Sequence, residues 1–200
     1  MKGEIVMYKS FLAGVMITIG AAVFLTVGGV TGSILFSIGL LTILYFQYEL
    51  FTGKAGLLAQ KKIEVAALGK IFCGNLLGCA FGVGILCLAG LAAEMREPAF
   101  AIITSRINNM WYENIFRGII CGVLMYIAVN EYKDAPYVTI MCIATFILLG
   151  ANHCVADMVY LMLGLVGRPD NWLAALLALG YTIIGNVIGC NLLPLCHSSK

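Results

Sequence analysis

Two short stretches decide how this chain folds: Glu49-Leu50-Phe51-Thr52-Gly53 and Gly150-Ala151-Asn152-His153-Cys154-Val155-Ala156-Asp157. Each places a glycine and polar or ionisable side chains inside an otherwise apolar run. An unsatisfied polar group in lipid costs several kcal/mol, so such residues are expected to have partners or a function. Hydrophobic segments interrupted at corresponding places in two halves of a membrane protein indicate a substrate site near the bilayer midplane. The sequence therefore predicts a transport protein whose site lies between the two breaks.

The composition is that of a membrane protein. Of 200 residues, 62% are hydrophobic and 11% are charged, with a mean hydropathy of +0.99. A soluble domain carries about 25% charged residues. No charge occurs in 10–48, 71–93 or 171–199, and each span is long enough for one or two helices of about 20 residues. We expect a single all-α integral membrane domain over 1–200, with no cleaved signal peptide because the first apolar run continues into the second.

The cysteines and the net charge exclude several other classes of protein. Seven of the eight cysteines lie in apolar spans and none forms a CxxC pair, so we interpret them as small hydrophobic side chains. Neither a metal site nor a cofactor is expected. The net charge of +2, without a basic arm, gives no indication of nucleic-acid binding.

The apolar runs predict six transmembrane helices, of which the second and the fifth are broken. A polar connecting loop, about 93–113, separates a first repeat at about 9–92 from a second at about 114–196. The expected spans are 10–27, 33 to the break at 49–53, 66–91, 113–129, 137–166 with the second break, and 172–195.

The two halves follow the same order: a plain helix, a broken helix, and a helix with the pattern Gly-Asn-x-x-Gly. Small residues let helices approach closely, and the asparagine can bond a neighbouring helix. Three spans reverse the direction of the chain across the membrane, so the second half is expected to be inverted relative to the first, giving a 3+3 inverted repeat. The positions of this pattern are Gly74, Asn75, Gly78, Gly185, Asn186 and Gly189.

The basic residues predict the orientation. With the amino terminus inside, all eight lysines fall on the cytoplasmic side and the four arginines on or near the other side. Cytoplasmic loops carry the excess of positive charge in membrane proteins. Both termini are therefore expected in the cytoplasm.

His153 is the only histidine inside a predicted span. An unperturbed histidine has a pKa of about 6.5, so its ring can exchange protons near neutral pH. Within a helix break in lipid we favour this function over a hydrogen-bonded core role. Thr52, in the opposite break, is the expected partner that fixes the imidazole tautomer. Asp157 follows His153 by four residues and shares its face if the helix is continuous there.

Three further residues have two interpretations each. Glu49 has either a structural role or a role in proton relay. We favour the structural role, in which its carboxylate caps helix amides or meets a basic group at the first break. Phe36 and Phe146 lie upstream of the two breaks. They either face lipid or the core, or they face the pore and form an apolar constriction.

Six segments together resemble the signature segments of the formate/nitrite transporter family. Each is a weak signal alone, but they occur in order, with compatible spacing, over nearly the whole chain. They are 9–14, 36–40, 50–53, 74–78, 153–157 and 185–189.

The resemblance implies an aquaporin-like protomer with its second and fifth helices broken, assembled as a homopentamer with one pore in each protomer. It implies passage of small monovalent anions of weak acids, such as formate or nitrite, across a bacterial inner membrane. By position, Phe36 and Phe146 form the outer constriction and Leu40 belongs to the inner one. His153 and Thr52 lie between them.

The implied mechanism links transport to protons. A bare anion pays a large desolvation penalty in an apolar constriction, whereas the neutral acid does not. A proton from His153, or relayed from water through it, neutralises the anion. Arg106 occupies the place of a lysine that the family usually has above the pore, where it attracts the anion.

Three departures from the family pattern affect the predicted site. Asn152 stands where formate channels usually have a glutamate, and Gly122 and Asp157 stand where asparagines are common. We assign Asn152 and Asp157 to the proton relay with His153 and Thr52. The alternative function is a channel for a small neutral solute such as water, ammonia or urea, in which flux does not depend on His153. An intramembrane enzyme is disfavoured because no nucleophile is paired with a base.

Overall fold

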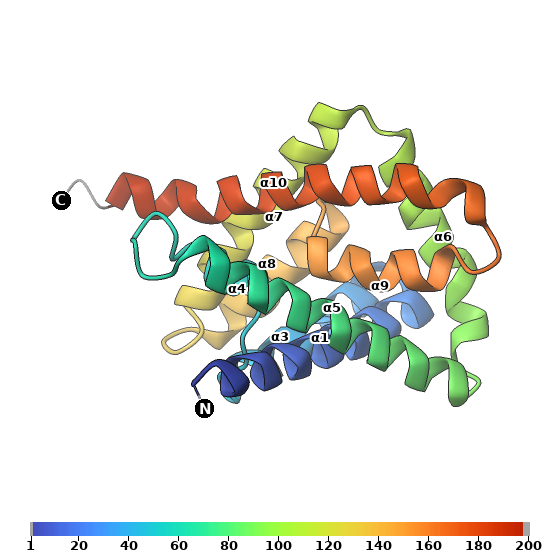
Figure 1. Ribbon diagram of the computed structural model, residues 1–200, viewed down its shortest axis with the longest axis horizontal. Coiled ribbons are helices and arrows are strands. Elements are labelled where there is room, and N and C mark those ends of the chain that lie inside the picture. Colours follow the sequence, from blue (N-terminus) through green and yellow to red (C-terminus); the bar gives the residue numbers. More distant parts are fainter. Residues whose placement is uncertain (1, 198–200) are drawn as a thin grey trace.

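The computed structural model describes residues 2–197, and within that range the secondary structure is helical, with no β-strand (Figure 1). The predicted all-helical class is confirmed. The helices are α1 (Lys2–Val27), α2 (Gly29–Leu35), α3 (Ser37–Tyr45), α4 (Phe51–Ala55), α5 (Val65–Leu88), α6 (Ala92–Asn108), α7 (Trp111–Asn130), α8 (Pro136–Leu148), α9 (Cys154–Gly164), the 3₁₀ turn η1 (Pro169–Asn171) and α10 (Trp172–His197).

Four of these helices are long and apolar enough to cross a membrane: α1, α5, α7 and α10. The shorter apolar helices are α2 with α3, α8 and α9. Helix α1 packs along α5, and α7 packs along α10, while α9 lies among α1, α5 and α6. In Figure 1, α1 begins and α10 ends toward the same end of the long axis.

The predicted connecting loop, 93–113, is wrong in its secondary structure, because most of it forms α6. Exposed charges such as Glu94, Arg96 and Glu97 give the segment a polar composition. Its buried positions nevertheless recur every three or four residues, as they do on one face of a helix. They are Ala92, Met95, Ala99, Ile103 and Arg106.

The first break is shifted relative to the prediction. The chain leaves the helical conformation over 46–50, and α4 begins at Phe51, so Phe51 and Gly53 belong to a short helix after the break. Helix α1 also begins at Lys2 rather than at residue 10. Charges mark where a membrane ends, but they do not end a helix.

Two further interruptions lie upstream of the first break, one before the broken span and one within it. Gly28, with φ 67 and ψ −178, turns the chain between α1 and α2, in a conformation that favours glycine. Phe36 separates α2 from α3 and lies buried against the core.

Glycines hold the long helices in close contact. A Cβ atom added to Gly78 of α5 would lie 1.9 Å from the carbonyl oxygen of Phe11 in α1. A Cβ atom added to Gly189 of α10 would lie 2.2 Å from the carbonyl oxygen of Ile119 in α7. Both helix pairs therefore approach as closely as their backbones allow.

We expect Gly78→Ala to lower the free energy of unfolding by about 1–3 kcal/mol, because its methyl group has no room against the α1 backbone. Thermal unfolding in detergent measures the change. Gly84→Ala is the matched control on the same helix, since a Cβ atom there meets no atom within 4 Å. Equal stability of the two variants would contradict the close contact.

Candidate functional site

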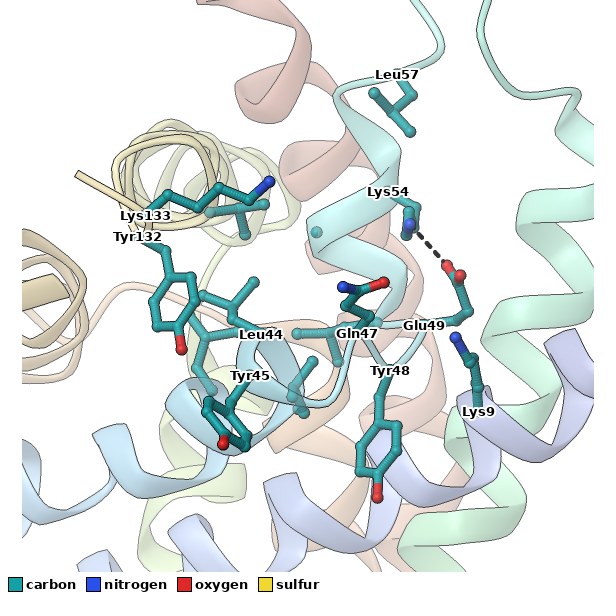
Figure 2. Close-up of a pocket in the computed structure, with 15 residues that line it drawn as sticks. Lys9, Leu44, Tyr45, Gln47, Tyr48, Glu49, Lys54, Leu57, Tyr132 and Lys133 are labelled. Atoms are coloured by element: carbon teal, nitrogen blue, oxygen red, sulfur yellow. Dashed lines mark ion pairs between the residues drawn. The ribbon is translucent and has the colours of Figure 1, made fainter. Parts of the chain in front are cut away.

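Two cavities lie toward opposite ends of α1. The first, the lysine vestibule, has a volume of about 570 Å³ and is lined by Lys9, Lys54, Lys133 and Glu49 (Figure 2). The second, the Arg106 cavity, has a volume of about 320 Å³ and includes Phe24 of α1 in its wall. At a rise of 1.5 Å per residue, Lys9 and Phe24 are about 22 Å apart along the helix. The cavities therefore open toward the two ends of the span.

The lysine vestibule has three lysines and one glutamate in a wall that is otherwise uncharged. Figure 2 shows the amine of Lys54 directed at the carboxylate of Glu49, from which it lies 2.9 Å, with Lys133 on the other side of the cavity. Glu49 thus meets a basic group, as one of its two interpretations expected. Gln47 also lines the vestibule and adopts a positive φ of 56, which is uncommon for a residue with a side chain.

Buried apolar side chains separate the two cavities. Leu40 and Leu50 line the vestibule side, and both are buried. On the other side, the rings of Phe36 and Phe146 meet edge to face with centroids 6.2 Å apart. Phe146 stacks on the ring of His153 at 5.6 Å, and both line the Arg106 cavity. The residues predicted to form constrictions are therefore brought to one region.

His153 and Thr52 meet at this barrier, with Nε2 of the ring 2.9 Å from the threonine hydroxyl oxygen. Both side chains are buried. The other ring nitrogen, Nδ1, accepts a hydrogen bond from the backbone N–H of Ala156 at 3.1 Å. Since a neutral imidazole has one donor and one acceptor nitrogen, this contact assigns the hydrogen to Nε2, which donates to Thr52.

The second break places the His153 ring. Gly150 has a φ of 66, which turns the chain after α8, and residues 151–153 run extended until α9 begins at Cys154. His153 occupies the position before the helix and caps it through its own side chain. The carbonyl oxygen of Gly150 accepts hydrogen bonds from Arg117 at 3.1 Å and Arg106 at 3.4 Å. The sequence analysis assigned no role to Arg117.

Asn75 satisfies the backbone of the first break. Its side-chain oxygen accepts from the N–H of Phe51 at 2.8 Å. Its amide nitrogen donates to the carbonyl oxygens of Ser10 and Glu49, at 2.8 and 2.9 Å. One buried side chain therefore joins the break to α1 and α5.

Asn186 does the same at the second break. Its side-chain oxygen accepts from the N–H of Cys154 at 2.9 Å. Its amide nitrogen donates to the carbonyl oxygens of Gly118 and Asn152, at 2.9 and 2.8 Å. The sequence pattern indicated an asparagine that bonds a neighbour, and the structure identifies that neighbour as the break itself.

Asn152 points away from both cavities. Its amide nitrogen donates to Asn114 of α7 at 2.9 Å and to Thr182 of α10 at 3.3 Å. It lies next to His153 in sequence, but its side chain packs between helices. Its assignment to a proton relay stays a prediction, and the structure gives it a bonding role in the helix interface.

Arg106 and Asp157 form a buried ion pair, with Nε of the arginine 3.6 Å from a carboxylate oxygen. Both line the Arg106 cavity together with His153. From the sequence, Arg106 was expected in a loop and was not paired with Asp157. The helical spacing of buried positions in α6 was the signal that placed Arg106 on the face toward α9.

The described residues contain no group of three or more His, Cys, Asp or Glu side chains that could hold a metal ion. The site combines the imidazole of His153, the hydroxyl of Thr52 and the ion pair of Arg106 and Asp157 in a mainly apolar surrounding. Such a set can exchange protons and orient a small polar molecule.

The sequence as a whole matches the model of one protein family, described as Formate/nitrite transporter, over residues 2–197. The chain belongs to the formate/nitrite transporter family. The resemblance of its signature segments is thereby confirmed.

Two curated relatives are similar in sequence to this family member. "Formate channel FocA" of Haemophilus influenzae is 25% identical over 162 residues, which are 70% of this chain and 57% of that protein. "Formate channel FocA" of Escherichia coli strain K12 is 24% identical over 222 residues, covering 94% of this chain and 78% of the relative. The first match thus spans little more than half the length of the relative. Both relatives are channels rather than enzymes.

Two solved structures share the fold. A "Pentameric formate channel with formate bound" superposes with a TM-score of 0.82 at 20% identity, covering 99% of this chain and 96% of the other. An "FNT family ion channel" superposes with a TM-score of 0.81 at 20% identity, covering 96% of this chain and 88% of the other. At this identity the likeness shows the fold alone.

We expect Asn186→Leu to destabilise the protein strongly, because it leaves the Cys154 N–H and the Asn152 carbonyl oxygen in the break without their side-chain partner, at about 1–3 kcal/mol for each buried group. The midpoint of thermal unfolding in detergent measures the loss. Asn130→Leu is the control, since the Asn130 side chain is exposed and bonds only the carbonyl of Tyr126 among the described hydrogen bonds. A loss no greater than that of the control would show that Asn186 does not hold the break.

Proposed function

We propose that this chain is a channel for small monovalent anions of weak acids, with formate or nitrite as first candidates, and that transport is linked to protons through His153. One observation carries the proposal. The pair formed by His153 and Thr52 is buried in an apolar barrier between two cavities that open toward opposite ends of the span. The relatives named formate channels support the substrate class.

The proposed architecture has six crossings in a 3+3 inverted repeat. The first repeat comprises α1, the broken span from α2 to α4, and α5; the second comprises α7, the broken span of α8 and α9, and α10. The equivalent hydrogen bonds of Asn75 and Asn186, and the equivalent glycine contacts of the two helix pairs, support this repeat. An even number of crossings places both termini on one side.

We assign that side to the cytoplasm of a bacterial inner membrane. Lys9, Lys54 and Lys133 surround one cavity, whereas Arg106 and Arg117 lie beside the other. Lysine and arginine in excess mark the cytoplasmic side, and the lysines are the larger group here. The lysine vestibule is then the cytoplasmic mouth.

A homopentamer with one pore in each protomer is the proposed assembly. The pentameric structure that shares the fold supports it. Large apolar side chains are exposed along α5, α7 and α10, among them Leu77, Phe116 and Leu173, and they suit contact with lipid or with neighbouring protomers.

The proposed mechanism follows from the cost of dehydration. An anion collected in the lysine vestibule cannot pass the barrier as a charge, because losing its water there costs far more than losing the water around the neutral acid. The Thr52 hydroxyl donates its proton to the anion as the Nε2 hydrogen of His153 moves to Thr52, and a proton from water returns to Nε2, so the ring is neutral before and after. The neutral acid crosses beside Phe36 and Phe146 and releases its proton in the Arg106 cavity.

Uptake into proteoliposomes under an imposed pH gradient tests the function. We expect the native protein to take up formate or nitrite in a gradient-dependent manner. His153→Asn is expected to reduce the rate by about 100-fold or more, the usual loss when a proton-transfer group is removed. Thr52→Ser, which keeps the hydroxyl, serves as the matched control and is expected to retain more uptake than Thr52→Val.

A pore for a neutral solute predicts a different outcome. Flux of water, ammonia or urea would then be insensitive to the pH gradient and to His153. Anion uptake that is the same in native protein and in the assembled His153→Asn variant would show that the proposed proton link is wrong.

The lysine vestibule gives a second prediction. Removing two of its charges, with Lys9→Gln and Lys133→Gln together, is expected to raise the KM for anion from that side several-fold and to weaken its dependence on ionic strength, because positive charge concentrates anions at a mouth. Initial rates at low and high salt measure the effect. Lys62→Gln is the control, as Lys62 is exposed and does not line the vestibule. Identical KM values for the double variant and the control would contradict it.

A further inference from the structure

Asp157 places a carboxylate that accepts no hydrogen bond in the wall of the Arg106 cavity. Its side chain is 4% exposed, and the residue forms part of the cavity wall. Neither carboxylate oxygen has a hydrogen-bond partner among the described residues. Burying a carboxylate that accepts no hydrogen bond costs free energy. A molecule that donates a hydrogen bond to this carboxylate would offset that cost, which favours its binding there.

Arg106 presents the complementary group. Its Nε lies 3.6 Å from the Asp157 oxygen, too far for a hydrogen bond, and has no hydrogen-bond partner among residues 2–197. Its Nη1 is held by the carbonyl oxygen of Gly150, which keeps the guanidinium against the cavity. The cavity therefore offers one hydrogen-bond donor beside one acceptor.

The ion pair changes what the cavity attracts. Arg106 alone would draw bare anions, but a carboxylate at 3.6 Å offsets much of that attraction and repels a second negative charge. Arg117 donates to the same Gly150 carbonyl oxygen as Arg106 but does not line the cavity, and Ser105, Tyr160 and His153 complete the polar lining. A neutral carboxylic acid fits both groups, with its O–H donating to Asp157 and its C=O accepting from Arg106.

We infer that Asp157 is a specificity-determining residue that makes the Arg106 cavity select the neutral form of a small weak acid and exclude bare anions. This inference rests on the proposed function, and it assigns to Asp157 the discrimination between protonated and unprotonated permeants at that mouth. Anions of strong acids, such as nitrate and chloride, carry no O–H near neutral pH. They offer Asp157 no donor.

Formate uptake with nitrate added at the Arg106 mouth, in reconstituted native protein and in Asp157→Asn, tests the inference. Asparagine keeps the shape and removes the negative charge. We expect this nitrate to leave formate uptake by the native protein unchanged and to inhibit uptake by Asp157→Asn at least tenfold more strongly. Asp170→Asn, an exposed acid outside both cavities, is the control and is expected to behave as native. Nitrate exclusion that persists in assembled Asp157→Asn would overturn the inference.

A second measurement uses the native protein alone, so it holds even if the variant fails to assemble. Nitrate is added to one face at a time during formate transport, in whole cells and in inverted vesicles. We expect nitrate to inhibit from the lysine side and not from the Arg106 side. Equal inhibition from both faces would overturn the inference.

The two failures are distinguishable. If the native protein takes up no weak acid at all, the proposed function is wrong and the inference falls with it. If weak-acid uptake depends on His153 while discrimination against nitrate is independent of Asp157, the proposed function stands and only the role of Asp157 is wrong.

Discussion

The structure depends on satisfying the backbone where two helices break inside the apolar region. Lipid offers no hydrogen bonds, so every N–H and C=O freed by a break needs a protein partner. Asn75 and Asn186 supply three hydrogen bonds each to the breaks and to the adjacent long helices. Because each asparagine is rigidly placed on a long helix, the extended segments of the breaks are fixed as well.

The glycines make this bonding possible. An asparagine side chain is short, so it reaches the backbone of the neighbouring helix only when the two helices lie close together. The contacts at Gly78 and Gly189 bring the paired helices close enough. The pattern Gly-Asn-x-x-Gly therefore combines two functions, close approach and backbone satisfaction. Without the close approach of the helices the asparagine would not reach the break, and without the asparagine the backbone of the break would lose its hydrogen-bond partner.

The fixed breaks in turn position the polar site. The N–H of Ala156, in the first turn of α9, donates to Nδ1 of His153, which leaves the Nε2 hydrogen directed at Thr52 from the opposite break. The barrier around this pair is apolar, while each cavity beyond it is charged. Lysines dominate one mouth, and an arginine balanced by an aspartate lies at the other. The two ends of the path thus differ in the species they favour.

The sequence by itself determined the all-helical membrane class, the two breaks and the residues that meet there, because a polar group among apolar residues is visible without coordinates. It did not determine that most of 93–113 is helical, since periodic burial was hidden by a polar composition. Only the tertiary structure decided that Arg106 pairs with Asp157 and that Asn152 faces α7 and α10. Those contacts join residues from different helices, and their geometry depends on how α6, α7, α9 and α10 pack.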